Sequence, residues 1–458
     1  MTHASGTATV GIDIGTTAVK AIAVDADGKV LARARVPHAV IAPVPDQLEH
    51  DAARAWRRGP NSAYASVAAG LDVKAAGIAG MVPSLTAVDP RGIPRTPGLL
   101  YGDARGRPQS RGDAAGEASF PDVEWLLRWT AGQAPLAQGY WPAQAVASRA
   151  LAGVGAMDTA MAVSFGRFHT WQGWDEEALA SAGARPAQMP LVAQMGEAVG
   201  TLAGTDTLVA AGTVDALADQ IVSGAELEGD VLVIFGATLV VWVVTTEWTE
   251  VPGYWTVPHT APGKVLVGGP SNAGALLVDW AGSLLSKRRP RGPAGSRPGS
   301  RNGDPARVPV WLPWVRGERV PFHDPAMKAS IHGLDLTQGP AAIERAALEA
   351  GGFVIRRILD KSGLPARRIV ASGGGSRSDG WMQAVADATG LPVARVAVPE
   401  GAALGAAWFA RMAAGLENGI EGASRWARTG STVEPDPAWT AAASERYAAF
   451  VELGPPAP

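Results

Sequence analysis

Two stretches of the chain share one pattern of apolar and polar positions. The mainly apolar stretch 10–24 is interrupted by Gly15-Thr16-Thr17, and the apolar stretch 231–244 is interrupted by Gly236-Ala237-Thr238. Each pattern predicts two short strands joined by a tight turn that glycine allows. Backbone N–H groups and hydroxyls at such a turn can hold a phosphate oxygen. The repeat therefore predicts two phosphate-contacting hairpins, although two ordinary hairpins in a duplicated core would also produce it.

The rest of the chain alternates between further predicted strands and helices. Strands are predicted at 29–36, 75–80, 85–89, 208–212, 368–372 and 392–398, and helices at about 50–76, 121–131, 143–152, 216–223, 379–389 and 402–414. Asp379 is expected to cap the helix that runs to about residue 389. Three antiparallel strands followed by mixed α/β structure are typical of the opening of a ribonuclease H-like domain. Because the second hairpin opens directly after the 216–223 helix, we place a domain boundary near residue 225.

The composition is that of a globular enzyme and excludes several classes of function. Of the 458 residues, 47% are hydrophobic and 18% are charged, which is typical of a folded chain. The net charge of −3 gives no electrostatic case for a nucleic-acid or membrane partner. The absence of cysteine excludes disulfides, thiol catalysis and thiolate metal sites, and the seven histidines lack metal-ligand spacing. With no visible signal peptide and no apolar run long enough to span a bilayer, we expect a cytoplasmic protein.

Residues 286–306 differ in composition from the rest of the chain. They are rich in Pro, Gly, Arg and Ser, and seven basic residues fall between Lys287 and Arg307 against one acidic residue. This composition favours a solvated flexible loop over an anion-binding patch.

The first hairpin carries Asp13-Ile14-Gly15-Thr16-Thr17 at its turn. The hydroxyls of Thr16 and Thr17 and the amide of Gly15 are suited to contact terminal phosphates. Asp13, an acid at the end of a buried strand, is placed to hold Mg²⁺ through water. A hairpin that simply has a polar turn would show the same residues.

Gly373-Gly374-Gly375 lies between a predicted strand and a predicted helix. Three glycines at this point let a flat ring or a phosphate approach the backbone, where the helix N-terminus favours an anion. A tight turn alone would also explain them. The segment does not match the G-x-G-x-x-G of dinucleotide-binding folds, and no G-x-x-x-x-G-K-[ST] occurs in the chain, which argues against Rossmann and P-loop sites.

Asp215 is the strongest candidate for a chemical role. It follows Gly212-Thr213-Val214 at the end of a predicted strand, just before the predicted domain boundary. Phosphoryl transfer to an alcohol needs in-line positioning, Mg²⁺, donors to the transferred oxygens and a carboxylate that accepts the hydroxyl proton. Asp215 is suited to the last task, although it could instead cap the helix that follows it. The chain has no G-x-S-x-G, which weakens a hydrolase interpretation.

Together these motifs resemble those of the FGGY carbohydrate kinases, a family within the actin-like ATPase superfamily, with xylulokinases as the most similar branch. The resemblance extends from Gly11 to about Gly415. Its further segments are Gly77-Ile78-Ala79-Gly80, Tyr101-Gly102-Asp103-Ala104-Arg105, Trp311-Leu312-Pro313-Trp314 through Pro321, Gly333 through Glu349, Trp381 through Asp387, and Gly401-Ala402-Ala403-Leu404-Gly405. The segments occur in the order that the family shows.

The resemblance implies two ribonuclease H-like domains, 1–224 and 225–458, with ATP and a sugar bound in an interdomain cleft. It makes Asp215 the catalytic base, assigns Asp13 to Mg²⁺, and places the helix that begins near Gly401 on the adenosine side. Nucleotide contacts are implied for Gly15, Thr16, Thr17, Lys20, Gly236, Thr238, Gly373, Gly374, Gly375 and Ser376. Substrate contacts are implied for Met81, Val82, Ser84, Asp103 and Asp215. The implied partners are ATP or ADP and a small sugar or polyol, and the resemblance leaves a homodimer open.

Several positions depart from the xylulokinase pattern. The usual G-Q-M-H-G is Gly80-Met81-Val82-Pro83-Ser84 here, so an imidazole of the sugar pocket is lost. The Asn that commonly follows the catalytic Asp is Ala216, and the usual Thr of the second hairpin is Ala237. We therefore expect ATP-dependent phosphorylation of a small sugar or polyol, such as xylulose or a related ketopentose. The alternative is a catalytically weak relative that binds sugar or nucleotide as a regulatory protein.

Overall fold

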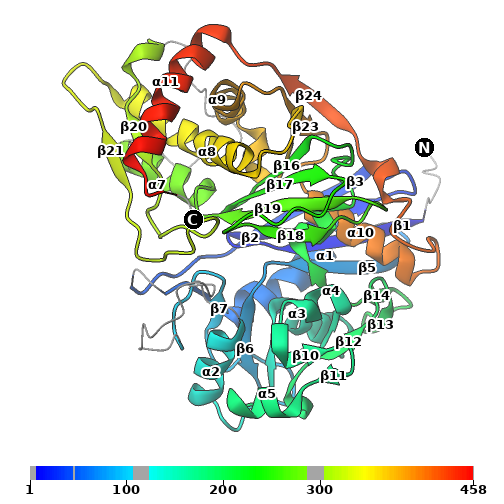
Figure 1. Ribbon diagram of the computed structural model, residues 1–458. Coiled ribbons are helices and arrows are strands. Elements are labelled where there is room, and N and C mark those ends of the chain that lie inside the picture. The colour runs from blue at the N-terminus through cyan, green and yellow to red at the C-terminus, as the bar shows by residue number, and fades with distance from the viewer. Residues whose placement is uncertain (1–6, 45–46, 107–122, 286–303, 457–458) are drawn as a thin grey trace. The chain divides into compact units, whose positions relative to one another are not determined.

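The chain forms two compact units (Figure 1). The computed structural model describes residues 7–44, 47–106, 123–285 and 304–456. The first unit comprises Met1–Val222 and Glu400–Trp426, and the second comprises Ser223–Pro399 and Ala427–Pro458. The chain thus leaves the first unit close to the boundary predicted near residue 225.

The first unit is built on a mixed sheet with the strand order β13-β14-β5-β1-β2-β3. Its strands are β1 (Ala8–Ile14), β2 (Ala18–Val24), β3 (Val30–Pro37), β5 (Val73–Gly80), β13 (Ala198–Thr201) and β14 (Leu208–Ala210), and the short β15 (Thr213–Val214) pairs with the end of β5. β2 runs antiparallel to β1 and β3, whereas β5 runs parallel to β1. β1 and β2 are buried along nearly their whole length, which explains why both show continuous apolar runs.

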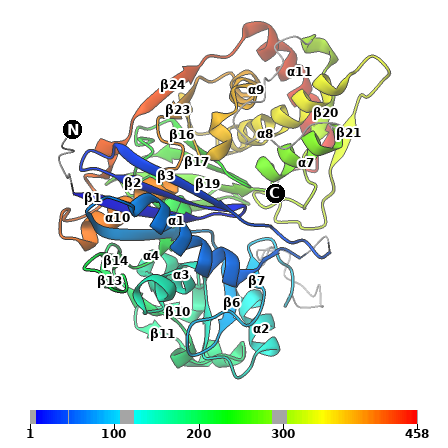
Figure 2. The ribbon, with the colours of Figure 1, turned by 180° about the vertical axis from the view of Figure 1, so that it is seen from behind.

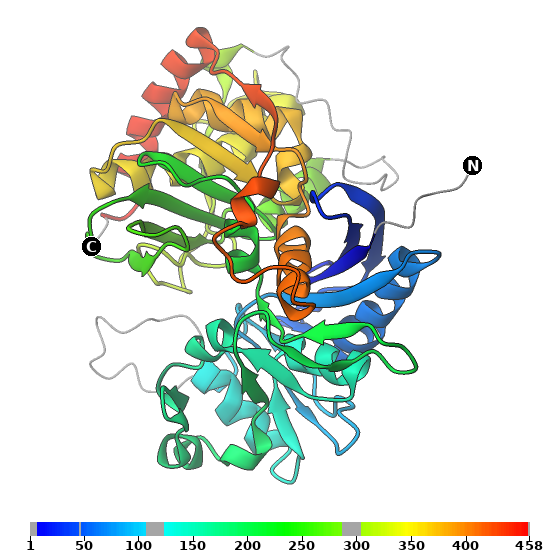
Figure 3. The same ribbon diagram turned by 90° about the vertical axis from the view of Figure 1, so that its right-hand side faces the viewer.

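Helices cover both faces of this sheet (Figure 2). Because side chains alternate along a strand, Val10 and Ile12 of β1 point to one face, where they share a core with α1 (Gly59–Ala68) and α3 (Ala143–Ala152). Gly11 points to the other face, toward α10 (Gly401–Ala413). Figure 3 shows α10, coloured orange, lying along the blue strands of the sheet. Although α10 follows the predicted boundary near residue 225, it packs in the first unit, because its packing partners are β1 and β5.

Smaller elements complete the first unit. They are the sheet β4 (Glu49–His50), β7 (Gly98–Leu100), β6 (Ser84–Val88) and β8 (Gly139–Trp141), the paired strands β9 (Ala156–Asp158) and β12 (Leu191–Ala193), and β10 (His169–Thr170) with β11 (Gly173–Trp174). Among the described residues, its remaining helices of five or more residues are η1 (Ala53–Arg58), α2 (Val123–Gln133), α4 (Thr159–Val163), α5 (Glu176–Ser181) and α6 (Asp215–Gln220). The last of these carries the candidate base at its first position.

The second unit repeats the strand arrangement of the first. Its sheet has the order β18-β19-β17-β16-β22-β23-β24, formed by β16 (Asp230–Phe235), β17 (Leu239–Thr245), β18 (Trp255–Pro258), β19 (Val265–Ser271), β22 (Arg368–Ser372), β23 (Val393–Val396) and β24 (Thr429–Val433). The antiparallel hairpin β16–β17 and the parallel strand β22 correspond to β1–β2 and β5 of the first sheet. The predicted α/β fold with two related domains is confirmed.

The α-helices in the described part of the second unit are α7 (Ala275–Leu285), α8 (Pro340–Ser362), α9 (Asp379–Thr389) and α11 (Pro437–Leu453). α9 is capped by Ser378, whose side chain accepts a hydrogen bond from the Trp381 amide, so the predicted cap at Asp379 is displaced by one residue. Across the described residues, no helix is both long and apolar enough to cross a membrane. The predicted loop 286–306 lies outside the described residues except for its last three positions.

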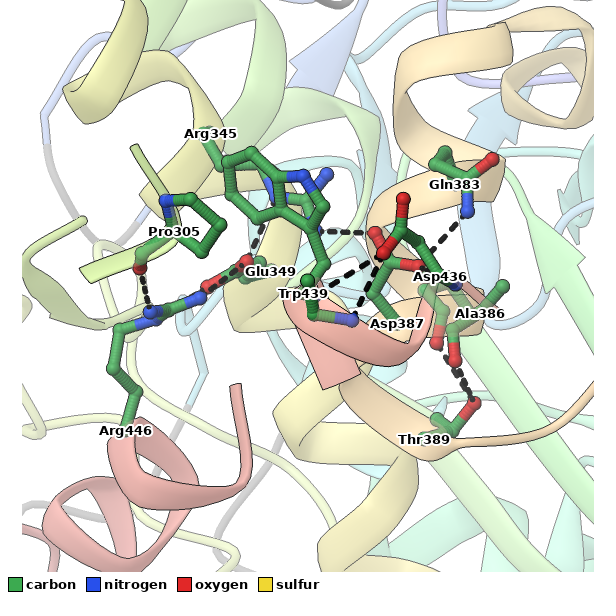
Figure 4. A network of polar contacts seen from close by, with 12 residues as sticks. Pro305, Arg345, Glu349, Gln383, Ala386, Asp387, Thr389, Asp436, Trp439 and Arg446 are labelled. Atoms are coloured by element: carbon green, nitrogen blue, oxygen red, sulfur yellow. Dashed lines mark hydrogen bonds and ion pairs between the residues drawn. The ribbon is translucent and has the colours of Figure 1, made fainter. Parts of the chain in front are cut away.

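A buried ion-pair network joins three of these helices (Figure 4). Glu349 of α8 lies between the guanidinium groups of Arg345 and Arg446, which contact its carboxylate at 2.7 and 2.8 Å. Arg345 also contacts Asp387 of α9 at 2.7 Å, and Asp387 accepts a hydrogen bond from Gln383. Both carboxylates are fully buried, so removing one partner would leave an unpaired buried charge. These residues of the C-terminal motifs therefore have a structural role.

Three glycines let α10 approach its neighbours closely. A Cβ added at Gly11 would lie 1.7 Å from the Ala403 carbonyl oxygen, and one at Gly77 would lie 1.9 Å from that of Ala406. Within α10 itself, a Cβ at Gly405 would lie 1.8 Å from the Ala218 carbonyl oxygen of α6. All three obstructions are backbone atoms, which cannot move without shifting a whole element. Glycine is therefore required at these positions.

We predict that Gly405→Ala destabilises the first unit, whereas Gly132→Ala does not. Both glycines lie within helices, but a Cβ at Gly132 in α2 would meet nothing within 4 Å. The Gly405 change should cost roughly 3 kcal/mol or more through overpacking. The Gly132 change should add about 0.5–1 kcal/mol of stability, because alanine favours the helix. Urea unfolding of both variants would measure the two effects, and an equally stable Gly405→Ala variant would contradict this packing argument.

Candidate functional site

Three parallel strands of the first sheet end side by side, and each is followed by a candidate residue. Ile14 of β1 pairs with Gly80 of β5, and Gly80 pairs in turn with Val214 of β15. The next residues along the chain are Gly15, Met81 and Asp215. Ligands of α/β sheets bind outside the carboxyl ends of parallel strands. The register thus places the first hairpin turn, the start of the predicted sugar segment and the candidate base at one edge of the sheet.

Side chains from distant segments hold the turn of the first hairpin. The turn is closed by a hydrogen bond from the Gly15 amide to the Ala18 carbonyl at 3.1 Å. The hydroxyl of Thr16 is hydrogen-bonded to that of Tyr101 at 3.0 Å. The Gly15 carbonyl is hydrogen-bonded to Nε2 of His38 at 3.0 Å. Thr17 is the exposed residue of the turn.

His50 binds the carbonyl oxygen of Thr16 from a fully buried position. Its Nε2 lies 2.7 Å from that oxygen, and its Nδ1 accepts the indole N–H of Trp56 at 3.0 Å. Since an indole N–H can only donate, Nδ1 carries no proton and Nε2–H donates to Thr16. Burial lowers the pKa of His50 to about 4, so the ring is neutral at physiological pH. The sequence showed no sign of this role, because only the fold brings residue 50 to the turn.

Asp13 and Lys20 form an ion pair beside the turn. The two residues are directly opposite each other in the β1–β2 ladder, and Nζ of Lys20 lies 3.0 Å from Oδ2 of Asp13. Asp13 is 5% exposed. Its charge raises the pKa of Lys20 above the ordinary value, against the opposing effect of burial, and Glu400 and Asp219 act in the same direction. Lys20 is therefore a fixed positive charge among three carboxylates.

Two of these carboxylates were not among the predicted site residues. Asp219 lies in α6 and Glu400 directly precedes α10, and both are buried. Oδ1 of Asp219 lies 2.4 Å from the point where a Cβ at Gly401 would be. The positive end of the α10 dipole favours acidic groups at this position. No motif in the sequence pointed to them, because their proximity to Lys20 depends on how α10 packs.

Asp215 is the first residue of α6 and is half-buried. Val214 occupies the N-cap position, and one carboxylate oxygen of Asp215 accepts a hydrogen bond from the Ala216 amide at 2.7 Å. The alternative that Asp215 is itself the helix N-cap is therefore not what the structure shows. Its position next to β5 and β1 stays consistent with a role in chemistry.

The residues predicted to contact the sugar differ in how deeply they are buried and in whether their polar groups already make hydrogen bonds. Met81 is almost fully buried, whereas Val82 is only partly buried. Ser84 is fully buried, and its hydroxyl accepts a hydrogen bond from the Ala143 amide at 3.1 Å. Asp103 is also fully buried, and its oxygens accept hydrogen bonds from Arg105 and from the Leu48 amide. The polar groups of Ser84 and Asp103 are thus already engaged within the protein.

In the second unit, the two glycine-containing turns lie next to each other. Ile234 of β16 pairs with Ser372 of β22, so Gly236-Ala237-Thr238 and Gly373 follow adjacent parallel strands. Gly373 has a φ of +83°, and a Cβ there would lie 2.8 Å from the Phe235 carbonyl oxygen. Both observations explain why this position is glycine.

The glycine turn also has an open side. Gly374 is exposed, and a Cβ there would meet nothing within 4 Å. In contrast, a Cβ at Gly375 would lie 2.5 Å from the Trp381 ring. Ser376 is buried, and its hydroxyl donates to the Gly373 carbonyl at 2.7 Å. A ligand would therefore approach this turn at Gly374, whereas Ser376 acts by holding the turn in shape.

Comparison with known proteins identifies the family. A model of the N-terminal domain of the FGGY family of carbohydrate kinases matches residues 8–109, and a model of its C-terminal domain matches residues 231–414. The chain belongs to the FGGY family of carbohydrate kinases. It is accordingly an ATP-dependent sugar kinase by family, and the predicted resemblance is confirmed.

Individual FGGY kinases match over most of the chain. A xylulose kinase from Streptomyces rubiginosus is 28% identical over 418 residues, which cover 84% of this chain and 83% of the relative. The crystal structure of a xylulose kinase from Rhodospirillum rubrum matches with a TM-score of 0.73 and 26% identity, covering 97% of this chain and 98% of the other. The crystal structure of a gluconate kinase from Lactobacillus acidophilus matches with a TM-score of 0.76 and 20% identity, covering 98% of this chain and 97% of the other. This last likeness shows the shared FGGY fold.

The family implies a magnesium ion. The residues around Asp13 fit a magnesium ion whose ligands are mainly phosphate oxygens and water. Among the described residues, no group of three acidic or histidine side chains is placed to hold a metal directly. Mg²⁺ commonly keeps several waters and needs only one or two carboxylates beside substrate phosphates. Asp13, at the hairpin turn of this FGGY kinase, offers such a carboxylate, with Lys20 as its present partner.

We predict that in the His50→Gln variant the free energy of unfolding falls less at acidic pH than in the wild type. The pKa of His50 is about 4 in the folded protein and about 6.5 in an unfolded chain, so the unfolded state gains a proton first as the pH falls. The neutral ring therefore adds to the free energy of unfolding above about pH 6.5, and this contribution is lost as the pH falls toward 4. Between pH 7.5 and pH 5 the loss amounts to about 2 kcal/mol. Glutamine keeps an N–H for Thr16 but does not titrate. Urea unfolding at both pH values should show a smaller loss for the variant than for the wild type, and an equal loss would contradict the role assigned to His50.

Proposed function

We propose that this FGGY kinase transfers the γ-phosphate of ATP to a hydroxyl of a small sugar or polyol, a ketopentose such as xylulose or a relative of it. The observation that carries the proposal is the register of three parallel strand ends. It brings the turn of Thr16, the segment that starts at Met81 and the carboxylate of Asp215 to one edge of the first sheet. A phosphate-contacting turn, a substrate segment and a base are the parts that transfer to an alcohol requires.

Asp215 acts as the general base in this proposal. Its carboxylate accepts the proton of the attacking hydroxyl as the bond to phosphorus forms. The hydrogen bond from the Ala216 amide limits the rotation of the carboxylate, so the side chain is held in one orientation before substrate binds. Such pre-positioning matters because phosphoryl transfer depends mainly on alignment and electrostatics.

The proposed nucleotide contacts of the first unit lie at the hairpin turn. The hydroxyls of Thr16 and Thr17 and the ammonium of Lys20 are the groups that suit phosphate oxygens. The contact expected from the Gly15 amide is not kept in the proposal, because that amide donates to the Ala18 carbonyl. His50 and Tyr101 support the turn by binding the backbone and hydroxyl of Thr16. Bound near Asp13, Mg²⁺ would neutralise charge that develops on the transferred phosphoryl group.

The proposed nucleotide contacts of the second unit lie at its two glycine-containing turns. Gly236 and Thr238 belong to the hairpin, and Gly373 to Ser376 belong to the turn after β22. The carbonyls of Gly236 and Ala237 already accept the first amides of α7, at 2.9 and 3.1 Å. The hairpin turn is therefore held by a helix, and the exposed Gly374 provides the accessible backbone.

Within this class of substrates, we propose that D-xylulose itself is not preferred, and that the best substrate carries its hydroxyls in a different arrangement. Val82 and Pro83 stand where xylulokinases have Met and His, and Ala216 stands where they have Asn, so two polar partners are missing. The polar groups of Ser84 and Asp103 are engaged within the protein and do not replace them. A neutral hydrogen bond contributes about 0.5–1.5 kcal/mol. Two missing bonds would reduce the affinity for D-xylulose by about 5- to 150-fold.

We expect Asp215→Asn to lower kcat by about 10²-fold or more while ATP still binds, because an amide cannot accept the hydroxyl proton. Steady-state kinetics on the best substrate, together with calorimetry of ATP binding, would measure both quantities. Asp175→Asn is the matched control, since Asp175 caps α5 with a hydrogen bond from the Ala178 amide at 2.8 Å and lies outside the proposed site. Near-normal turnover by Asp215→Asn would exclude the proposed base.

A panel of pentuloses, polyols, gluconate and glycerol, assayed with ATP for sugar phosphate, should contain a substrate better than D-xylulose. Its kcat/KM should exceed that for D-xylulose because the pocket lacks the imidazole and amide that xylulokinases carry. If D-xylulose is the best substrate, the inference from Val82, Pro83 and Ala216 is wrong. If no member of a broad panel is phosphorylated while ATP still binds, a regulatory binding protein becomes the better account.

A further inference from the structure

The strand that leads to Asp215 is irregular. Val209 of β14 pairs with Ala76 of β5, and Thr213 of β15 pairs with Ala79. Three residues (210–212) thus lie between the two pairs on one strand and two (77–78) on the other, so the first strand carries one extra residue, as in a β-bulge. Bulges disrupt the hydrogen bonds of the sheet locally and re-aim the residues that follow. The irregularity lies at residues 210–212, so the sheet does not hold the chain continuously up to Thr213 and Val214, which pair with β5 again directly before Asp215.

Gln144 supplies hydrogen bonds at this irregular point. It is the second residue of α3 and is fully buried. Its Nε2 donates to the Gly80 carbonyl at 2.8 Å and to the Thr213 carbonyl at 3.2 Å. One amide group therefore links the end of β5 to the end of β15. These two strand ends lead to Met81 and to Asp215.

The surroundings of Gln144 leave space for this side chain and little else. A Cβ at Gly212 would lie 2.5 Å from Cβ of Gln144, and one at Gly80 would lie 3.2 Å from its Nε2. The Gly212 carbonyl accepts the amide of Asp158 at 2.8 Å, so the bulge has a second support from β9. Within the described part of the chain, Oε1 of Gln144 has no hydrogen-bond partner. Gln144 therefore contacts its neighbours through the N–H donors of its side-chain amide and not through the oxygen.

We infer that Gln144 is a positioning residue for catalysis, which sets the Asp215 carboxylate relative to the sugar segment that begins at Met81. This inference rests on the proposed function of Asp215. Gln144 acts through the Thr213 and Gly80 carbonyls, to which its amide donates. A displacement of about 1 Å at a reacting group can cost about 10²-fold in rate. Small movements of the Thr213 backbone therefore matter for turnover even when the fold is intact.

Gln144→Met tests the inference, because it keeps the length of the side chain and removes both donated bonds. We expect kcat on the best panel sugar to fall by about 10- to 100-fold, while KM for ATP changes less than about twofold. Gln188→Met is the matched control: Gln188 is also buried, and its Nε2 donates to the Ala137 carbonyl at 2.8 Å, away from the strand ends. This control should lose comparable stability in urea and keep its kcat.

Two further variants complete the test. Gln144→Asn withdraws the amide by one methylene and should show the same loss of kcat, so it serves if the Met variant does not fold. The double variant of Gln144→Met with Asp215→Asn should be no slower than Asp215→Asn alone, because a missing base cannot be misplaced. Wild-type kcat in a folded Gln144 variant, or a further additive loss in the double variant, overturns the inference. A normal kcat in Asp215→Asn would instead overturn the proposed function.

Discussion

The close packing of α10 on the first sheet is the constraint on which the arrangement of this unit depends. At Gly11 and Gly77 the helix backbone occupies the space of a side chain, and at Gly405 the same holds for α6. Because backbone meets backbone at these points, the helix has little freedom to slide or tilt. Its N-terminus is thereby fixed near Lys20, and α6, which begins with Asp215, is fixed against it. A helix distant in sequence thus determines where the candidate base lies.

The groups proposed to act on the substrate are few, and buried polar side chains hold most of them in place. His50, itself held by Trp56, binds the carbonyl of Thr16, and Gln144 binds the carbonyl of Thr213. In each case the side chain contacts backbone rather than the reacting groups. This arrangement suits phosphoryl transfer, in which alignment and electrostatics contribute more than covalent chemistry by the protein. Replacing such supports is expected to change rates before it changes the fold.

Family membership defines the reaction more closely than it defines the sugar. The strand ends, the hairpin turns and Asp215, to which we assign the phosphoryl transfer, are all present in this chain. Val82, Pro83 and Ala216 lie where substrate selection is expected, and they differ from xylulokinases in hydrogen-bonding capacity. A hydrogen-bonding site discriminates strongly, because polar groups left unpaired are costly. Substrate choice can therefore change at a few positions while the framework stays the same.

The sequence by itself determined both hairpins, most strands and helices, the duplicated α/β fold and the residues Thr16, Asp215 and Gly373 as candidates. These features are encoded locally, by apolar periodicity and by glycines at turns. It did not determine that α10 belongs to the first unit, that Asp103 is fully engaged by Arg105, or that His50, Gln144, Asp219 and Glu400 lie near the site. Those facts depend on contacts between segments far apart along the chain. Only the tertiary structure decides them, because a residue's neighbours in space are set by packing and not by its neighbours in sequence.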